Sequence, residues 1–124
     1  MTQHIVCKFG GSSVANAAQI RKVKDILAAN SDRKYLVVSA PGRDDTDREK
    51  VTDHLLNIAT SGRHFRQQQK SISPEESSRA VVGKFKKLVA ELDIDGADII
   101  KQLQADLKKS VPEKKRNDFF ASRG

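Results

Sequence analysis

Two adjacent glycines, Gly10 and Gly11, separate a short apolar run from a stretch with helical periodicity. The run Ile5–Phe9 predicts a β-strand, and the apolar spacing of residues 16–29 predicts an amphipathic helix. Glycine adopts backbone conformations that other residues avoid, so the chain can turn sharply between these two elements. This part of the chain is therefore predicted to form a strand, a tight turn and a helix.

A second apolar run, residues 35–39, follows the predicted helix and is typical of a strand that is covered on both faces. Strand, helix and strand over this distance predict two parallel strands joined by a right-handed crossover. The turns after both strands then open at the same edge of the sheet, where open α/β sheets bind their ligands. We therefore expect residues 8–13 and 39–42 to line one crevice.

The first of these turns carries the groups that a polyphosphate needs. Gly10 and Gly11 can present backbone N–H groups, Ser12 and Ser13 add hydroxyl donors, and Lys8 adds a compact positive charge. Neither the P-loop pattern nor the dinucleotide-binding glycine pattern occurs in the chain. The geometry alone leaves a second interpretation open, in which the glycines only form a tight turn and the lysine is solvated.

The next segment predicts a helix that begins near Thr46 and ends at Gly62. Thr46 and Glu49 have the spacing of a capping box, which makes Thr46 the capping residue. Thr52 then lies near the helix N-terminus, where its hydroxyl and the helix dipole could meet an anionic substrate, or where it could simply face solvent. Residues 63–73 are polar and predict a loop or a mobile hairpin.

Three further helices are predicted, and their apolar residues are interpreted as core. A Ser-Pro pair at residues 73–74 starts the first of them, and residues 93–96 form the turn that follows. The next helix should stop near Pro112, and residues 113–123 predict the last. The expected core positions are Val81, Phe85, Leu88 and Leu92 in the first helix and Ile100, Leu103 and Leu107 in the second.

Composition argues against several other classes of protein. The net charge is +7, but 23 Lys and Arg are interspersed with 16 Asp and Glu, and without Trp there are few rings on which bases could stack, so no nucleic-acid partner is expected. No apolar segment is long enough for a membrane span, and Cys7 is the only cysteine. We expect a cytoplasmic protein without a membrane partner. The three histidines lie too far apart in sequence for a local zinc site, and no metal ligands are assigned.

Several motifs in the chain resemble those of the aspartate kinases, which are members of the amino-acid kinase family. They are K-F-G-G-S-S-V at 8–14, V-V-S-A-P-G at 37–42, K-V-T-D-H-L-L at 50–56 and F-F-A-S-R-G at 119–124. Ser12 stands where the family usually has threonine, and the hydroxyl is kept. The resemblance implies an α/β fold, the N-terminal part of a three-layer α/β/α sandwich with a mainly parallel sheet and an appended helical segment.

The same resemblance implies an activity. Aspartate kinases transfer the γ-phosphoryl group of ATP to the β-carboxylate of L-aspartate, the first step towards lysine, threonine and methionine, with Mg²⁺ carried by the nucleotide. The family motif reads S-x-G-E, and the sequence stops at Gly124, one residue short of the glutamate. Residues 1–124 are therefore expected to be the N-terminal portion of the catalytic domain, without the regulatory ACT domains. Such a fragment should be inactive alone, and its parent is expected to be a homo-oligomer.

The resemblance also assigns roles to individual residues. Lys8 is expected to be the catalytic residue, because it would stabilise charge on the transferring phosphoryl group. The residues expected to bind the nucleotide are Lys8, Phe9, Gly10, Gly11, Ser12 and Ser39. Those expected to bind aspartate are Ser13, Ser39, Thr52 and Ser122.

Three alternatives stay open. A kinase acting on glutamate or carbamate would share the fold, although V-T-D-x-L-L and the terminal S-x-G favour aspartate. A non-catalytic module that binds a carboxylate or a phosphate would show ligand-dependent stabilisation without turnover. A basic nucleic-acid-binding domain would show an affinity that falls steeply with salt, whereas a kinase would bind nucleotide saturably with magnesium.

Overall fold

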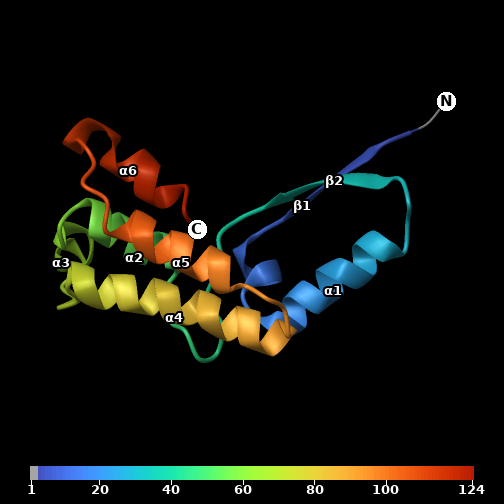
Figure 1. The fold of residues 1–124 in the computed structure, drawn as a ribbon, viewed down its shortest axis with the longest axis horizontal. Coiled ribbons are helices and arrows are strands. Elements are labelled where there is room, and N and C mark those ends of the chain that lie inside the picture. The colour runs from blue at the N-terminus through green and yellow to red at the C-terminus, as the bar shows by residue number, and fades with distance from the viewer. Residues whose placement is uncertain (1–2) are drawn as a thin grey trace. The chain divides into compact units, whose positions relative to one another are not determined.

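The computed structural model describes residues 3–124, and the chain divides after Arg48 into two compact units (Figure 1). The first unit contains β1 (Ile5–Phe9), a short 3-10 helix η1 (Gly11–Val14), α1 (Ala17–Ala28) and β2 (Arg33–Val38). The second contains α2 (Val51–Ala59), α3 (Arg63–Gln67), α4 (Pro74–Leu92), α5 (Ala97–Leu107) and α6 (Glu113–Ala121).

In the first unit β1 and β2 pair in parallel, with Lys8 opposite Val37 and Phe9 opposite Val38. The helix between them begins after Asn16, whose side-chain oxygen accepts a hydrogen bond from the N–H of Gln19 at 3.0 Å. This cap supplies an acceptor to a backbone N–H group of the first turn, which has no partner within the helix. The predicted order of strand, helix and parallel strand is confirmed.

The covering of β2 differs from the prediction. Tyr35, Leu36, Val37 and Val38 were expected to be covered on both faces, yet their exposed fractions are 56%, 48%, 51% and 54%. The strand also begins at Arg33 rather than at residue 35. Within the described residues the sheet has two strands, so β2 has a strand neighbour on one side only. A continuous apolar run predicts the strand correctly, but it does not tell what covers that strand.

The second unit is built around α2, which packs against both α4 and α6. A capping box starts α4: the Ser73 hydroxyl accepts from the N–H of Glu76 at 3.1 Å, and the Glu76 carboxylate accepts from the N–H of Ser73 at 2.7 Å. The hydrogen bond from the Ser73 backbone N–H to the carboxylate is the main reason that the pKa of Glu76 lies below its ordinary value, and the Ser73 hydroxyl lowers this pKa further. The buried apolar residues of this unit are Val51, Leu55, Ala59, Phe65, Val81, Leu88, Ile100, Leu103, Leu107 and Phe120.

The predicted start of α2 is wrong. One carboxylate oxygen of Asp44 accepts hydrogen bonds from the N–H and the hydroxyl of Thr46 and from the N–H of Asp47, each at 2.8 Å. An aspartate that binds the backbone two and three residues ahead forms a turn in place of a helix start. Thr46 therefore belongs to this turn, and α2 begins at Val51, after Lys50, without a side-chain cap.

The predicted loop at residues 63–73 contains a helix, α3. Phe65 explains the difference, because its side chain is fully buried and fixes this polar segment to the core. Gly62, predicted to end α2, has φ +88° between α2 and α3, a conformation that favours glycine. The helix α5 ends at Leu107, earlier than Pro112 would require, and the last helix is confirmed with its end at Ala121.

We predict that Ser73→Ala lowers the free energy of unfolding of the second unit by about 1 kcal/mol, because it removes the hydroxyl half of the capping box. Urea denaturation followed by circular dichroism measures the change. Ser78→Ala on the same helix is the matched control and should have little effect. Equal midpoints for the two variants would contradict a stabilising role for this cap.

Candidate phosphate and carboxylate site

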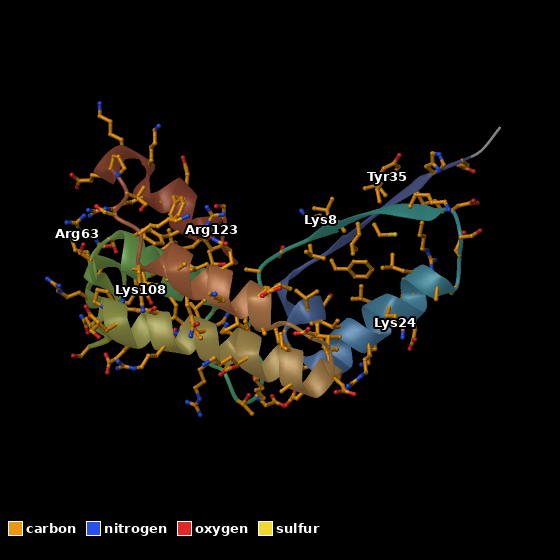
Figure 2. The ribbon with its side chains drawn as sticks, in the orientation of Figure 1. Lys8, Lys24, Tyr35, Arg63, Lys108 and Arg123 are labelled. Atoms are coloured by element: carbon orange, nitrogen blue, oxygen red, sulfur yellow. The ribbon has the colours of Figure 1, made fainter. Side chains whose placement is uncertain are left out.

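Lys8 lies on β1 with its side chain exposed. Burial along β1 alternates, so Ile5, Cys7 and Phe9 are half-buried while Val6 and Lys8 are exposed. Figure 2 shows Lys8 and Tyr35 on the side of the sheet opposite α1. No carboxylate among residues 3–124 forms an ion pair with Lys8. The ammonium group is therefore available to an anionic ligand.

The turn after β1 is formed by Gly10 and η1. Gly10 precedes this short helix in an extended conformation, and its carbonyl accepts from the N–H of Ser13 at 3.1 Å. The N–H groups of Gly11 and Ser12 open the helix, so neither has a partner inside it. A Cβ atom added to Gly10 would meet no atom within 4 Å, so the space beside this backbone is open.

The turn after β2 lies directly against the turn after β1. The N–H of Ser39 donates to the carbonyl of Phe9 at 3.0 Å, and the N–H of Gly42 donates to the carbonyl of Gly11 at 2.9 Å. A Cβ atom on Gly42 would lie 2.7 Å from the carbonyl carbon of Gly11, so only glycine allows this approach. The prediction that both turns meet at one edge of the sheet is confirmed. Ser39 is exposed there.

Thr52 lies in the first turn of α2 and is half-buried. Its hydroxyl forms no hydrogen bond with any residue in the described range, unlike the two side chains that follow it. Asp53 accepts from Nε2 of His64 at 3.1 Å, and Nδ1 of His54 lies 3.1 Å from the Ser77 hydroxyl. These two contacts hold α2 against α3 and α4 and leave the Thr52 hydroxyl available.

The contact between His54 and Ser77 resembles a nucleophile with its base, but its surroundings exclude that role. Ser77 is fully buried, and its hydroxyl also accepts from Nδ2 of Asn57 at 2.9 Å. Asn57 is itself fully buried, donates to the carbonyl of Ile72 at 3.0 Å and accepts from the N–H of Phe65 at 3.1 Å. A hydroxyl enclosed in this network cannot reach a substrate, so the network is structural.

Sequence reasoning missed Asn57 because nothing in its neighbourhood marks it. An asparagine among the apolar positions of an amphipathic helix is expected on the solvated face. Its partners Phe65 and Ile72 come from the path of residues 61–72, and the third, Ser77, comes from α4; neither is visible in the sequence pattern.

Ser122 follows α6, and its hydroxyl donates to the carbonyl of Phe119 at 2.8 Å. The residue is exposed, and α6 packs against α2, the helix that carries Thr52. The structure thus brings together Phe9, Gly10, Gly11 and Ser39 in the first unit. Thr52 and Ser122 belong to the second unit, and their participation in the same site stays a prediction.

Residues 3–124 contain no group of three or more His, Cys, Asp or Glu side chains placed to hold a metal ion. Among the helices in this range, none combines the length and the apolar character needed to cross a membrane.

Residues 3–114 match the amino acid kinase family. Since this match covers most of the chain, the protein belongs to the amino acid kinase family. The chain is 39% identical over 114 residues to aspartokinase 3 of Bacillus subtilis (strain 168), a match that covers 87% of this chain and 24% of the relative.

Solved structures agree with this assignment. The fold matches the crystal structure of Clostridium acetobutylicum aspartate kinase with a TM-score of 0.73 and 32% identity, over 98% of this chain and 26% of that protein. The α/β fold with a parallel sheet is therefore that of an aspartate kinase. The chain spans about a quarter of the length of these relatives.

We predict that Gly42→Ala disrupts the contact between the two turns, whereas Gly10→Ala leaves the fold intact. The new methyl group would collide with the backbone of Gly11 in the first variant and would enter open space in the second. Amide hydrogen exchange over residues 8–14 measures the effect, and faster exchange is expected for Gly42→Ala only. Unchanged exchange in both variants would show that the turns do not depend on this close approach.

Proposed function

We propose that the polypeptide containing this chain is an aspartate kinase, which transfers the γ-phosphoryl group of ATP to the β-carboxylate of L-aspartate. The observation that carries the proposal is the direct contact between the turns after β1 and β2, through the backbones of Gly11 and Gly42. Lys8, near the end of β1, has no ion-pair partner among residues 3–124. The similarity to aspartokinase 3 and to a solved aspartate kinase gives independent support. Because the chain spans only about a quarter of these relatives, the activity is proposed for the whole polypeptide.

Lys8 has the principal role in catalysis. Phosphoryl transfer depends mainly on positioning and on neutralising charge on the phosphate oxygens. An ammonium group that no carboxylate of the described residues pairs with is suited to this. Gly10 and Gly11 would present N–H groups to the phosphates, with the Ser12 hydroxyl and the backbone of Phe9 beside them. The open space next to Gly10 is consistent with a ligand at this backbone.

The carboxylate substrate would be held by hydroxyl groups. Thr52 stands in the first turn of α2, where the helix dipole favours an anion, and its hydroxyl has no hydrogen-bond partner in the described part of the chain. Ser13, Ser39 and Ser122 would complete this set, with Ser39 between the phosphate and the substrate. Donors of this kind bind a carboxylate without adding a competing positive charge.

The groups present fit a magnesium nucleotide better than they fit a resident metal. The first turn offers N–H groups, hydroxyls and an ammonium group, which bind phosphate oxygens, and the described residues hold no cluster of carboxylates for a metal. Mg²⁺ would therefore enter with ATP and neutralise charge on its phosphates. The product would be aspartyl phosphate, which leads to lysine, threonine and methionine. The enzyme would be a cytoplasmic homo-oligomer.

We predict that Lys8→Ala lowers the turnover number by at least about a hundredfold without unfolding the protein, because no other described cation replaces it on β1. Acyl phosphate formation by the natural polypeptide, trapped with hydroxylamine, measures turnover. Lys24→Ala, which removes an exposed lysine from α1, is the control and should leave turnover unchanged. Near-normal turnover of Lys8→Ala would exclude Lys8 from the mechanism.

A second prediction concerns Thr52. Thr52→Val should raise the Michaelis constant for aspartate about ten- to a hundredfold, since a hydrogen bond to a charged group contributes about 1.5–3 kcal/mol. The Michaelis constant for ATP should change little. Thr52→Ser keeps the hydroxyl, so its Michaelis constant for aspartate should stay close to that of the unmodified protein. Equal effects on both substrates would instead indicate a general disturbance of α2.

A further inference from the structure

The helix α5 carries a buried carboxylate, that of Asp106, which is 6% exposed. One of its oxygens, Oδ1, accepts hydrogen bonds from Nε2 of Gln102 at 2.9 Å and from Nζ of Lys109 at 2.8 Å. The bond from Lys109 is the main reason that the pKa of Asp106 lies below its ordinary value, despite the opposing effect of burial. The carboxylate is therefore charged at neutral pH.

The other oxygen of Asp106, Oδ2, faces Arg123. Arg123, labelled in Figure 2, lies two residues after the end of α6. The distance from Nε of Arg123 to Oδ2 of Asp106 is 3.2 Å, and the guanidinium group lies 4.3 Å from the centre of the Phe119 ring. Nε is buried and makes no hydrogen bond of good geometry. Charge attraction and stacking on the ring hold this side chain in place.

The position of Arg123 in the sequence raises the question of whether it binds a substrate. It stands between Ser122 and Gly124, in the S-R-G segment that ends the chain. An arginine beside a site for a carboxylate substrate would ordinarily be expected to bind that carboxylate in a bidentate manner. Here its charge already faces Asp106, and its guanidinium group lies over the Phe119 ring.

We propose that Asp106 is a positioning residue: by holding Arg123 it fixes the S-R-G segment, so that Arg123 orders the backbone of this segment and does not bind the substrate carboxylate. The effect on the substrate rests on the proposed function, in which Ser122 contacts aspartate. The contact between Asp106 and Arg123 does not rest on it. The two can therefore be tested separately.

The kinetic test compares Asp106→Asn, Arg123→Gln and the double variant in the natural polypeptide. Each single variant should raise the Michaelis constant for aspartate about ten- to a hundredfold, because a small displacement of a positioning group has effects of this size. The Michaelis constant for ATP should stay within about twofold. The Michaelis constant for aspartate of the double variant should be no higher than that of either single variant, because both substitutions remove the same contact. Asp118→Asn, at an exposed position of α6, is the matched control.

Two kinetic outcomes would overturn the proposal. If Arg123→Gln had a far larger effect than Asp106→Asn, and the two effects added, Arg123 would be a substrate ligand. If Asp106→Asn lowered the melting temperature but left the Michaelis constant for aspartate unchanged, Asp106 would have only a structural role.

A second measurement is independent of activity. In the full chain labelled with ¹⁵N-arginine, the Nε–H signal of Arg123, assigned with Arg123→Lys, should exchange slowly with water. It should exchange at least tenfold faster in Asp106→Asn and should be unaffected in Asp118→Asn. Rapid exchange in the unmodified chain would refute the contact itself. Slow exchange in a polypeptide that forms no acyl phosphate from aspartate would refute the proposed function and leave the contact standing.

Discussion

The backbone contact between Gly11 and Gly42 is the constraint on which the candidate phosphate site depends. Because β1 and β2 are parallel, their C-terminal ends lie at the same edge of the sheet. The turns that follow them can meet there only if no side chain lies between them. The hydrogen bond from Gly42 to the carbonyl of Gly11 fixes the first turn from the side of the second. The N–H groups at the start of η1 and the ammonium group of Lys8 are thereby presented from a rigid support.

In the second unit, buried polar groups fix chain segments against one another. Asn57 binds residues from three successive segments after α2, and Asp106 holds Arg123 after α6. Leaving either group without its partners would cost the energy of an unsatisfied buried polar atom, so each specifies one arrangement of the chain. Two of the residues with proposed substrate contacts are held by these networks: Thr52 lies on α2, and Ser122 directly follows α6.

Strong local signals predicted much of this structure from the sequence. The start of α4 at the Ser73-Pro74 pair and the two parallel strands were predicted correctly, because each depends on residues close in sequence or on a simple connection rule. The start of α2 was predicted wrongly, because the Asp44 carboxylate competes for Thr46. The helix at residues 63–67 was missed because the burial of Phe65 is a tertiary effect. The roles of the site residues rest on motif resemblance rather than on periodicity, and they stay predictions.

The proposed reaction can be measured directly in the natural polypeptide that contains residues 1–124. ATP, Mg²⁺ and hydroxylamine are combined with L-aspartate, L-glutamate or carbamate in parallel, and the hydroxamate or phosphate product is quantified. We expect saturable product formation with L-aspartate, dependent on both ATP and Mg²⁺, and at most about a hundredth of that rate with the other two acceptors. Nucleotide binding without turnover on aspartate, or a preference for glutamate or carbamate, would contradict the assignment.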